Sequence, residues 1–243
     1  MARRAAPFAF LFAPALVAGL IGSLAGCPND DPVTPGEDAG TDAVDIDVGP
    51  SPCPTGYLGD PSKEPEIELR ALTVDGKDVP LLPGNDLAII LPPQGGRVAF
   101  VGVRVRNMDG CAVKIVGAMR DPTSGLVTLD GRTVNLTRED DGWGTTGRGA
   151  NITNIDDSLA IADYSNIPLC PNSWSKQDVF DTPHDIEVVV TDRRKRTVRK
   201  TVSIVPRCAQ PGAREAACRC LCRNGYVLGD LCGEDAGVEA GAQ

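Results

Sequence analysis

Nine cysteines in a chain of 243 residues constrain its fold more than any other feature of the sequence. One of them, Cys27, ends an apolar N-terminal run. The other eight are spread over the rest of the chain: Cys53, Cys111, Cys170, Cys208, Cys218, Cys220, Cys222 and Cys232. An even number of cysteines in an exported protein is typical of a disulfide framework. We therefore expect up to four disulfides among these eight residues, and the spacing leaves their pairing open.

Zinc binding is the alternative role for Cys218, Cys220 and Cys222, which alternate along the sequence. On an extended strand, alternate cysteines do not form the chelate with two intervening residues that structural zinc sites commonly use. The single histidine of the chain, His184, is also distant in the sequence. The pattern favours disulfides, and we expect neither a metal site nor a cofactor.

The first 26 residues have the pattern of an export signal. Arg3 and Arg4 precede an uncharged apolar stretch, residues 5–25, and small residues crowd its end. The segment Leu24-Ala25-Gly26-Cys27 resembles the lipobox of bacterial lipoprotein precursors. That resemblance implies a signal peptide over residues 1–26, acyl chains on Cys27 and an oxidising compartment. The alternative is an uncleaved transmembrane anchor, since about 20 apolar residues can span a bilayer.

Residues 27–64 are predicted to contain the acylated cysteine and a linker. Residues 28–52 hold seven acidic residues, five prolines and no basic residue. Such a composition cannot bury enough apolar surface to offset the entropy of ordering the chain. Fully extended, these residues would reach roughly 80–90 Å. Residues 233–243 are predicted to be a disordered acidic tail, so the charge of the chain lies mainly outside its folded part.

Residues 65–208 show a β pattern. Short apolar alternations recur between glycine and proline turns, with no sustained helical spacing. The predicted strands are at 67–71, 98–105, 113–119, 186–190 and 198–204, with the last two paired across a basic turn. The sequence therefore predicts an all-β protein with an immunoglobulin-like β-sandwich and a small disulfide-rich C-terminal segment.

Short motifs in this region are similar to those of uncharacterised bacterial envelope lipoproteins that contain one β-sandwich domain. The motifs are Pro92-Pro93-Gln94-Gly95-Gly96, Val103-Arg104-Val105-Arg106-Asn107, Cys170-Pro171-Asn172 and Pro206-Arg207-Cys208. The resemblance covers about 140 residues and implies a fold but no activity.

The segment 209–232 holds too few large apolar residues for a core of its own, so we expect disulfides to stabilise it. The run Cys220-Leu221-Cys222-Arg223-Asn224-Gly225-Tyr226, ending at Cys232, is similar to the second half of an EGF-like module. This resemblance implies a bond between Cys222 and Cys232.

Three features suggest chemistry or binding. His184 would have to serve any Ser/His/Asp triad or histidine metal site, but no supporting motif is present and a strand-edge histidine is favoured. The acidic loop Glu139-Asp140-Asp141-Gly142-Trp143 could bind calcium or hydrolyse a glycoside. The basic turn Arg193-Arg194-Lys195-Arg196 could contact an anionic surface, or it could protect a sheet edge from aggregation.

These observations predict a lipid-anchored protein of the cell envelope that acts as a structural, adhesive or ligand-binding module and not as an enzyme. The expected partners are the membrane, through the lipid anchor, and an unidentified protein or glycan; nucleic acid is not expected. Pro28 and Asn29 lack the aspartate that marks inner-membrane retention, which favours the outer membrane. The alternative is an envelope hydrolase that acts on glycan or cell wall through the loop at 139–143.

Overall fold

The computed structural model describes residues 53–92, 95–147 and 162–233. All of them belong to one compact unit, Pro50–Gln243. The predicted lipobox, Cys27, the acidic residues 28–52 and the tail after Gly233 lie outside the described residues. Within the three described ranges, no helix has the length and apolar character needed to cross a bilayer.

The first large sheet is built around β5 (Arg97–Arg106), which matches the strand predicted at 98–105. On one side β5 pairs with β2 (Glu66–Leu72), which continues through a turn into β3 (Asp78–Pro80). On the other side it pairs first with β11 (Ser165–Cys170) and then with β10 (Gly144–Thr145). The short strand β9 (Thr137–Arg138) completes the sheet beside β10.

The second sheet has the order β4-β13-β12-β7-β8. Its centre is the hairpin of β12 (His184–Thr191) and β13 (Thr197–Arg207), where Ile186 faces Val202 and Val190 faces Val198. This register confirms the hairpin predicted across the basic turn. β7 (Val113–Arg120) and β8 (Val127–Val134) extend one side, and β4 (Asp86–Ala88) runs parallel to β13 on the other.

Both sheets contribute to one hydrophobic core. Alternate residues of each strand point inward because successive side chains on a strand face opposite sides of the sheet. The buried aliphatic residues include Leu69, Val101, Val103, Val105 and Ile167 from the first sheet, and Ile115, Met119, Ile186, Val188 and Ile204 from the second. The prediction of an all-β protein is confirmed.

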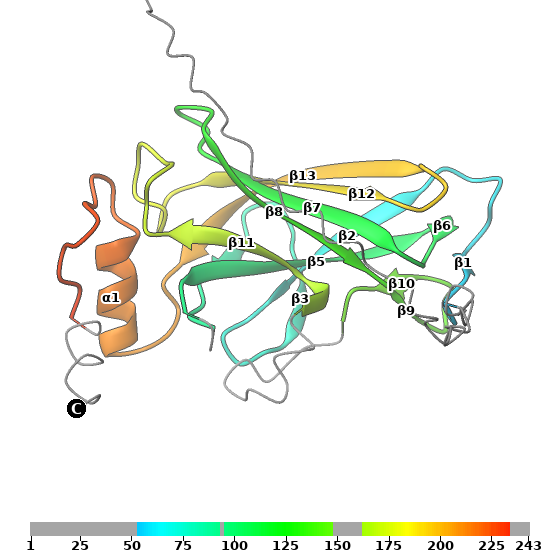
Figure 1. The fold of residues 1–243 in the computed structure, drawn as a ribbon, viewed down its shortest axis with the longest axis horizontal. Helices are drawn as coiled ribbons and strands as arrows, with labels where there is room; N and C mark the ends of the chain where they lie inside the picture. Colours follow the sequence, from blue (N-terminus) through cyan, green and yellow to red (C-terminus); the bar gives the residue numbers. More distant parts are fainter. Residues whose placement is uncertain (1–52, 93–94, 148–161, 234–243) are drawn as a thin grey trace, which may run out of the picture. The chain divides into compact units, whose positions relative to one another are not determined.

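Strands β8 and β11 lie side by side although they belong to different sheets (Figure 1). The Thr128 hydroxyl donates to the Pro168 carbonyl at 2.8 Å, and the Ser165 hydroxyl donates to the Asp130 carbonyl at 3.0 Å. Side chains of the two strands thus join the sheets along this edge.

The first described residue, Cys53, lies within the segment that the sequence assigned to the linker. β1 (Tyr57–Leu58) pairs with β6 (Met108–Asp109), and a disulfide joins Cys53 to Cys111. Leu58 is completely buried in the core. Residues 53–64 are therefore attached to the β domain by a strand pairing, a disulfide and a buried side chain.

The one helix among the described residues, α1 (Ala213–Leu221), contains Cys218 and Cys220. The expectation of an extended strand here was wrong. Alanine, arginine and glutamate precede Cys218, and these residues favour helix. Ala217 and Cys218 are buried against the domain. In a helix, Cys218 and Cys222 are one turn apart and lie on the same face.

Candidate functional site

All eight predicted cysteines form disulfides. The pairs are Cys53–Cys111, Cys170–Cys222, Cys208–Cys218 and Cys220–Cys232. The bond between Cys222 and Cys232 implied by the EGF-like resemblance was wrong, because Cys222 faces the end of β11 while Cys220 is on another face of α1. Two disulfides therefore attach the helix to the β domain, and a third closes the loop that follows it.

The sulfur atoms at the base of α1 are close together. Cys218 Sγ and Cys222 Sγ are 3.8 Å apart, and the sulfurs of Cys208, Cys218 and Cys222 all lie within 4.8 Å of one another. A metal ion would need these cysteines as free thiolates. Since each is bonded to another cysteine, the cluster acts as a structural connection.

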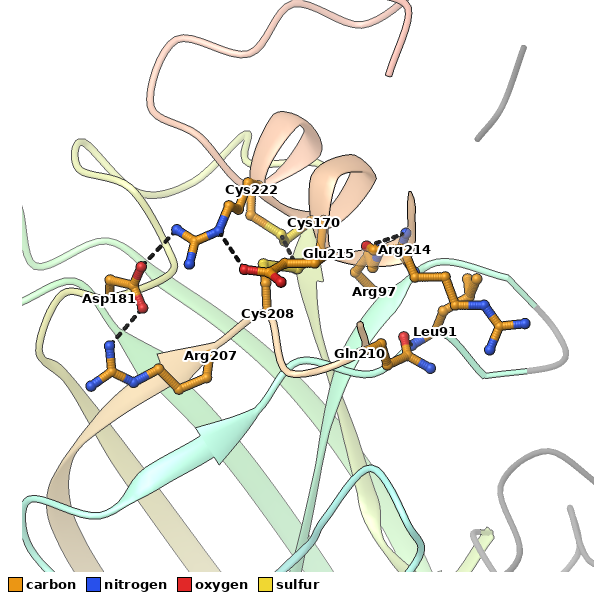
Figure 2. Close-up of a disulfide and its surroundings, with 12 residues drawn as sticks. Leu91, Arg97, Cys170, Asp181, Arg207, Cys208, Gln210, Arg214, Glu215 and Cys222 are labelled. Carbon is orange, nitrogen blue, oxygen red and sulfur yellow. Dashed lines mark hydrogen bonds and ion pairs between the residues drawn. A yellow bond between two sulfur atoms is a disulfide. The ribbon is translucent and has the colours of Figure 1, made fainter. Parts of the chain in front are cut away.

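Ion pairs reinforce this attachment (Figure 2). The Asp181 carboxylate accepts from Arg207 Nη1 at 2.6 Å and from Arg219 Nη1 at 2.7 Å, and Arg219 Nε also donates to Glu215 at 3.0 Å. The hydrogen bond from Arg207, together with that from Arg219, lowers the pKa of Asp181 although its partial burial acts in the opposite direction. One carboxylate thus connects β13 with α1.

The loop after α1 carries three exposed aliphatic residues, which we call the apolar tip: Val227, Leu228 and Leu231. Their exposed fractions are 64%, 85% and 85%. The Cys220–Cys232 disulfide closes the loop, and Cys232 itself is buried. The sequence patterns described above did not predict this feature. The available signal was a group of aliphatic residues in a short loop between cysteines, where solvated loops usually carry polar residues.

The basic turn between β12 and β13 surrounds two buried carboxylates, Asp109 and Asp192. Arg193 Nε donates to Asp109 at 2.7 Å, and Arg194 Nε lies 3.4 Å from the same carboxylate. Asp192 accepts backbone hydrogen bonds within the turn, from Arg194 and Arg196. Much of the basic charge therefore balances acidic groups inside the fold.

Arg196 connects this turn to the first described residues of the chain. Its guanidinium donates to the Tyr57 hydroxyl and to the carbonyls of Pro61 and Lys63. The Arg194 guanidinium lies 5.2 Å from the centre of the Tyr57 ring. Lys195 is exposed, with a left-handed φ of 67°. The predicted contact of this turn with an anionic surface stays a prediction.

Two carboxylates of the acidic loop bind an arginine of β5. Arg104 pairs with Glu139 at 2.5 Å and also with Asp141. Trp143 is only 8% exposed, and the guanidinium groups of Arg104 and Arg106 lie 4.6 and 4.7 Å from its ring centre. Arginine side chains therefore pair with Glu139 and Asp141 and lie over the indole ring of Trp143. These are groups that the sequence suggested for calcium binding or glycoside hydrolysis.

His184, the first residue of β12, is completely buried. Its Nδ1 lies 3.1 Å from the Thr182 carbonyl, its Nε2 lies 3.5 Å from the Ser175 hydroxyl, and its ring contacts Trp174 edge-on. Desolvation lowers the pKa of His184, although the Thr182 carbonyl, Asp121 and Asp185 act in the opposite direction. Burial therefore disfavours the charged form of the ring.

Ser175 and Asp121 lie beside His184, but their arrangement is not that of a triad. The Ser175 hydroxyl donates to Asp121 at 3.1 Å, whereas a triad aspartate would accept from the histidine. Burial tends to raise the pKa of Asp121, but hydrogen bonds from the Lys176 backbone, Ser124 and Thr123 lower it. These groups form a buried hydrogen-bond network that fixes the loop before β12.

A cavity of about 200 Å³ lies where β2, β4 and β13 approach each other. It is lined mainly by small apolar residues such as Ala71, Val74 and Ala88, with Asp86 and Arg207 at its polar side. Pockets for small organic ligands usually measure about 300–1000 Å³. This cavity is smaller than a typical ligand pocket.

No family model matches this sequence, and neither a curated protein nor a solved structure was found to match it.

Proposed function

We propose that this protein is a lipid-anchored module of the cell envelope with a structural, adhesive or ligand-binding role and no catalytic activity. The observation that carries the proposal is the distribution of its cysteines. Four disulfides use all eight cysteines from Cys53 to Cys232. Cys27, at the end of the lipobox-like segment, is the one cysteine without a partner cysteine inside the chain.

Disulfides persist in oxidising compartments outside the cytoplasm, which supports export. Acylation of Cys27 would then attach the domain to a membrane through the acidic residues 28–52. Pro28 and Asn29 after the cysteine support the outer membrane over the inner one.

We also propose that the two sheets form an immunoglobulin-like sandwich. The shared core of the sheets and the antiparallel β7-β12-β13 arrangement support this fold. The contact between β8 and β11 supports a barrel-like alternative at one edge. An experimental structure distinguishes the two, because a barrel would have continuous backbone pairing between β8 and β11.

The alternative of an envelope hydrolase loses its main support from the geometry of the acidic loop. Arg104 binds Glu139 and Asp141, and Trp143 is covered. An enzyme that used this loop would lose turnover of a cell-wall or glycan substrate when Glu139, Asp140 and Asp141 are changed to alanine. We expect no such turnover by the unaltered protein.

The anchor is tested by expressing the full chain in a Gram-negative host and comparing it with Cys27→Ser. We expect the unaltered protein in the membrane fraction, with acyl chains on the peptide that begins at Cys27 in mass spectrometry. Cys27→Ser should lack the acyl mass and keep its first 26 residues. Processing of the unaltered protein at another position, or an unmodified Cys27, would contradict the proposal.

A further inference from the structure

The strongest unexplained feature of the surface is the apolar tip. Leu228 and Leu231 are each 85% exposed, whereas the other exposed leucines among the described residues, Leu82, Leu126 and Leu129, are 55%, 43% and 59% exposed. Exposing large aliphatic side chains to water is unfavourable relative to burying them. Three such residues within five positions of one loop therefore indicate a surface that another molecule or a membrane contacts when the protein functions.

The loop is held in shape by its own bonds. Besides the Cys220–Cys232 disulfide, Arg223 pairs with Asp230 across the loop, and the Val227 N–H donates to the same carboxylate. The Asp230 N–H donates to the Val227 carbonyl at 3.0 Å. Binding consequently requires little additional ordering, and part of the backbone already has hydrogen-bond partners.

The base of the loop is fixed as firmly as its tip. The Asn224 N–H donates to Asp178 at 2.7 Å, and the Asn172 side chain donates to the Arg223 carbonyl. Cys222, where the loop begins, is bonded to Cys170 at the end of β11. The three aliphatic side chains are thus presented on a rigid support that belongs to the β domain.

Charge and size point to the kind of partner. Arg223 and Asp230 neutralise each other, so the described loop gives no attraction to an anionic surface. The following sequence, with Glu234 and Asp235, is acidic. Three aliphatic side chains also supply well under the ~800 Å² per partner that a stable protein dimer buries. A small, uncharged, aliphatic projection fits insertion among lipid acyl chains.

We propose that the loop closed by Cys220 and Cys232 inserts its apolar tip, Val227, Leu228 and Leu231, into the interfacial region of a lipid bilayer. Shallow insertion removes these side chains from water and leaves the charged pair at the level of the headgroups. In the lipid-anchored protein this contact would be a second attachment to a membrane. That role rests on the proposed function, but the insertion itself does not require Cys27.

The experiment uses the chain from residue 28 onward, which retains the whole unit Pro50–Gln243 and cannot be acylated at Cys27. The probe is flotation with vesicles of zwitterionic phosphatidylcholine. We expect binding at lipid concentrations on the order of millimolar, weaker than that of a single myristoyl chain. Binding should change less than twofold between about 0.05 and 0.5 M salt, since no net charge is involved.

The double variant Leu228→Ser/Leu231→Ser should lower the partition coefficient at least tenfold. The matched control is Leu82→Ser/Leu129→Ser, which removes the same number of exposed leucines elsewhere and should bind like the unaltered chain. Circular dichroism of both variants checks that the fold is retained. These substitutions are at exposed positions, so loss of folding is not expected.

Four results would overturn the proposal. The first is no flotation of the unaltered chain with phosphatidylcholine. The second is equal flotation of the tip variant and the control. The third is a concentration-dependent dimer in analytical ultracentrifugation that the tip variant abolishes, which would assign the tip to a second copy. Binding only to anionic vesicles, lost at high salt, would also contradict it and favour the basic turn. None of these results bears on acylation of Cys27, so the two proposals fail separately.

Discussion

Cys218 of α1 and Cys222, the C-cap of this helix, lie one helical turn apart with their sulfur atoms separated by 3.8 Å, yet each is bonded to a cysteine at the end of a different strand. Cys208 follows β13 and Cys170 ends β11. Because β11 belongs to the first sheet and β13 to the second, this single helix connects both sheets covalently.

Removing the Cys170–Cys222 bond should destabilise the protein more than removing Cys220–Cys232. The first bond closes a separation of 52 residues and the second one of 12. Loop-closure entropy predicts contributions of about 4 and about 3 kcal/mol. Urea unfolding of the two double alanine variants measures the difference. Equal losses of stability, or a larger loss on removing Cys220–Cys232, would show that loop length does not determine how much each disulfide stabilises the protein.

Disulfide mapping should recover the observed pairing. Trypsin can cleave after Arg219 and Arg223, and chymotrypsin after Leu221. Cys218, Cys220 and Cys222 then fall on separate peptides. We expect Cys220 linked to Cys232 by mass spectrometry without reduction. A peptide that links Cys222 to Cys232 would restore the EGF-like arrangement.

Arg196→Lys should loosen the first residues of the fold. Arginine reaches three oxygen atoms, those of Tyr57, Pro61 and Lys63, and a lysine ammonium cannot reproduce that planar fork. Amide hydrogen exchange of β1 and β6 should become faster, with about 1–2 kcal/mol less protection. The control Arg199→Lys, at an exposed pair with Glu187, should leave this exchange unchanged. Unchanged exchange in both variants would exclude a connecting role for Arg196.

Arg104→Ala should release the acidic loop. The substitution removes the counter-charge of Glu68, Glu139 and Asp141 together and uncovers one face of Trp143. We expect about 2–3 kcal/mol lower stability and a red shift of tryptophan fluorescence. Lys114→Ala, at an exposed position of β7, serves as the control. A variant as stable as this control would show that the carboxylates do not depend on Arg104.

Stability should rise with pH in the range where a histidine ordinarily titrates. The pKa of His184 is lowered in the folded protein, so the unfolded chain binds a proton at a higher pH than the folded one. The stabilisation is complete above the ordinary histidine pKa near 6.5 and is lost as the pH falls toward the folded value.

Urea unfolding at several pH values between about 5 and 7.5 measures this slope. Because His184 is the single histidine, His184→Leu should flatten it. A slope that persists in the variant would assign the proton uptake to another group.

Local patterns predicted much of this fold. Alternation along β12 and β13 was sufficient for their register, since one face of each strand is buried and a shift by one residue would expose it. In contrast, β8 has exposed or half-exposed residues along nearly its whole length, so no buried apolar face marks it as a strand in the sequence. It was identified only by its pairing with β7.

The partners of charged residues could not be predicted for a different reason. Arg193 binds Asp109 and Arg196 binds Tyr57, residues that are distant in the sequence. A basic turn looks the same in a sequence whether its charges face solvent or neutralise buried carboxylates. The disulfide pairing depended likewise on whether the segment around Cys220 is helical or extended.

The Cys53–Cys111 disulfide would have a mechanical consequence if the domain is held by its N-terminus, as we propose. Tension applied before Cys53 would pass through the sulfur–sulfur bond to Cys111, which lies two residues before the start of β7 in the second sheet. The strands between these two cysteines, β1 to β6, lie inside a closed covalent loop and outside the covalent path of that force. Force applied through an N-terminal anchor would therefore reach the second sheet through Cys111. It would not unfold the first strands one after another.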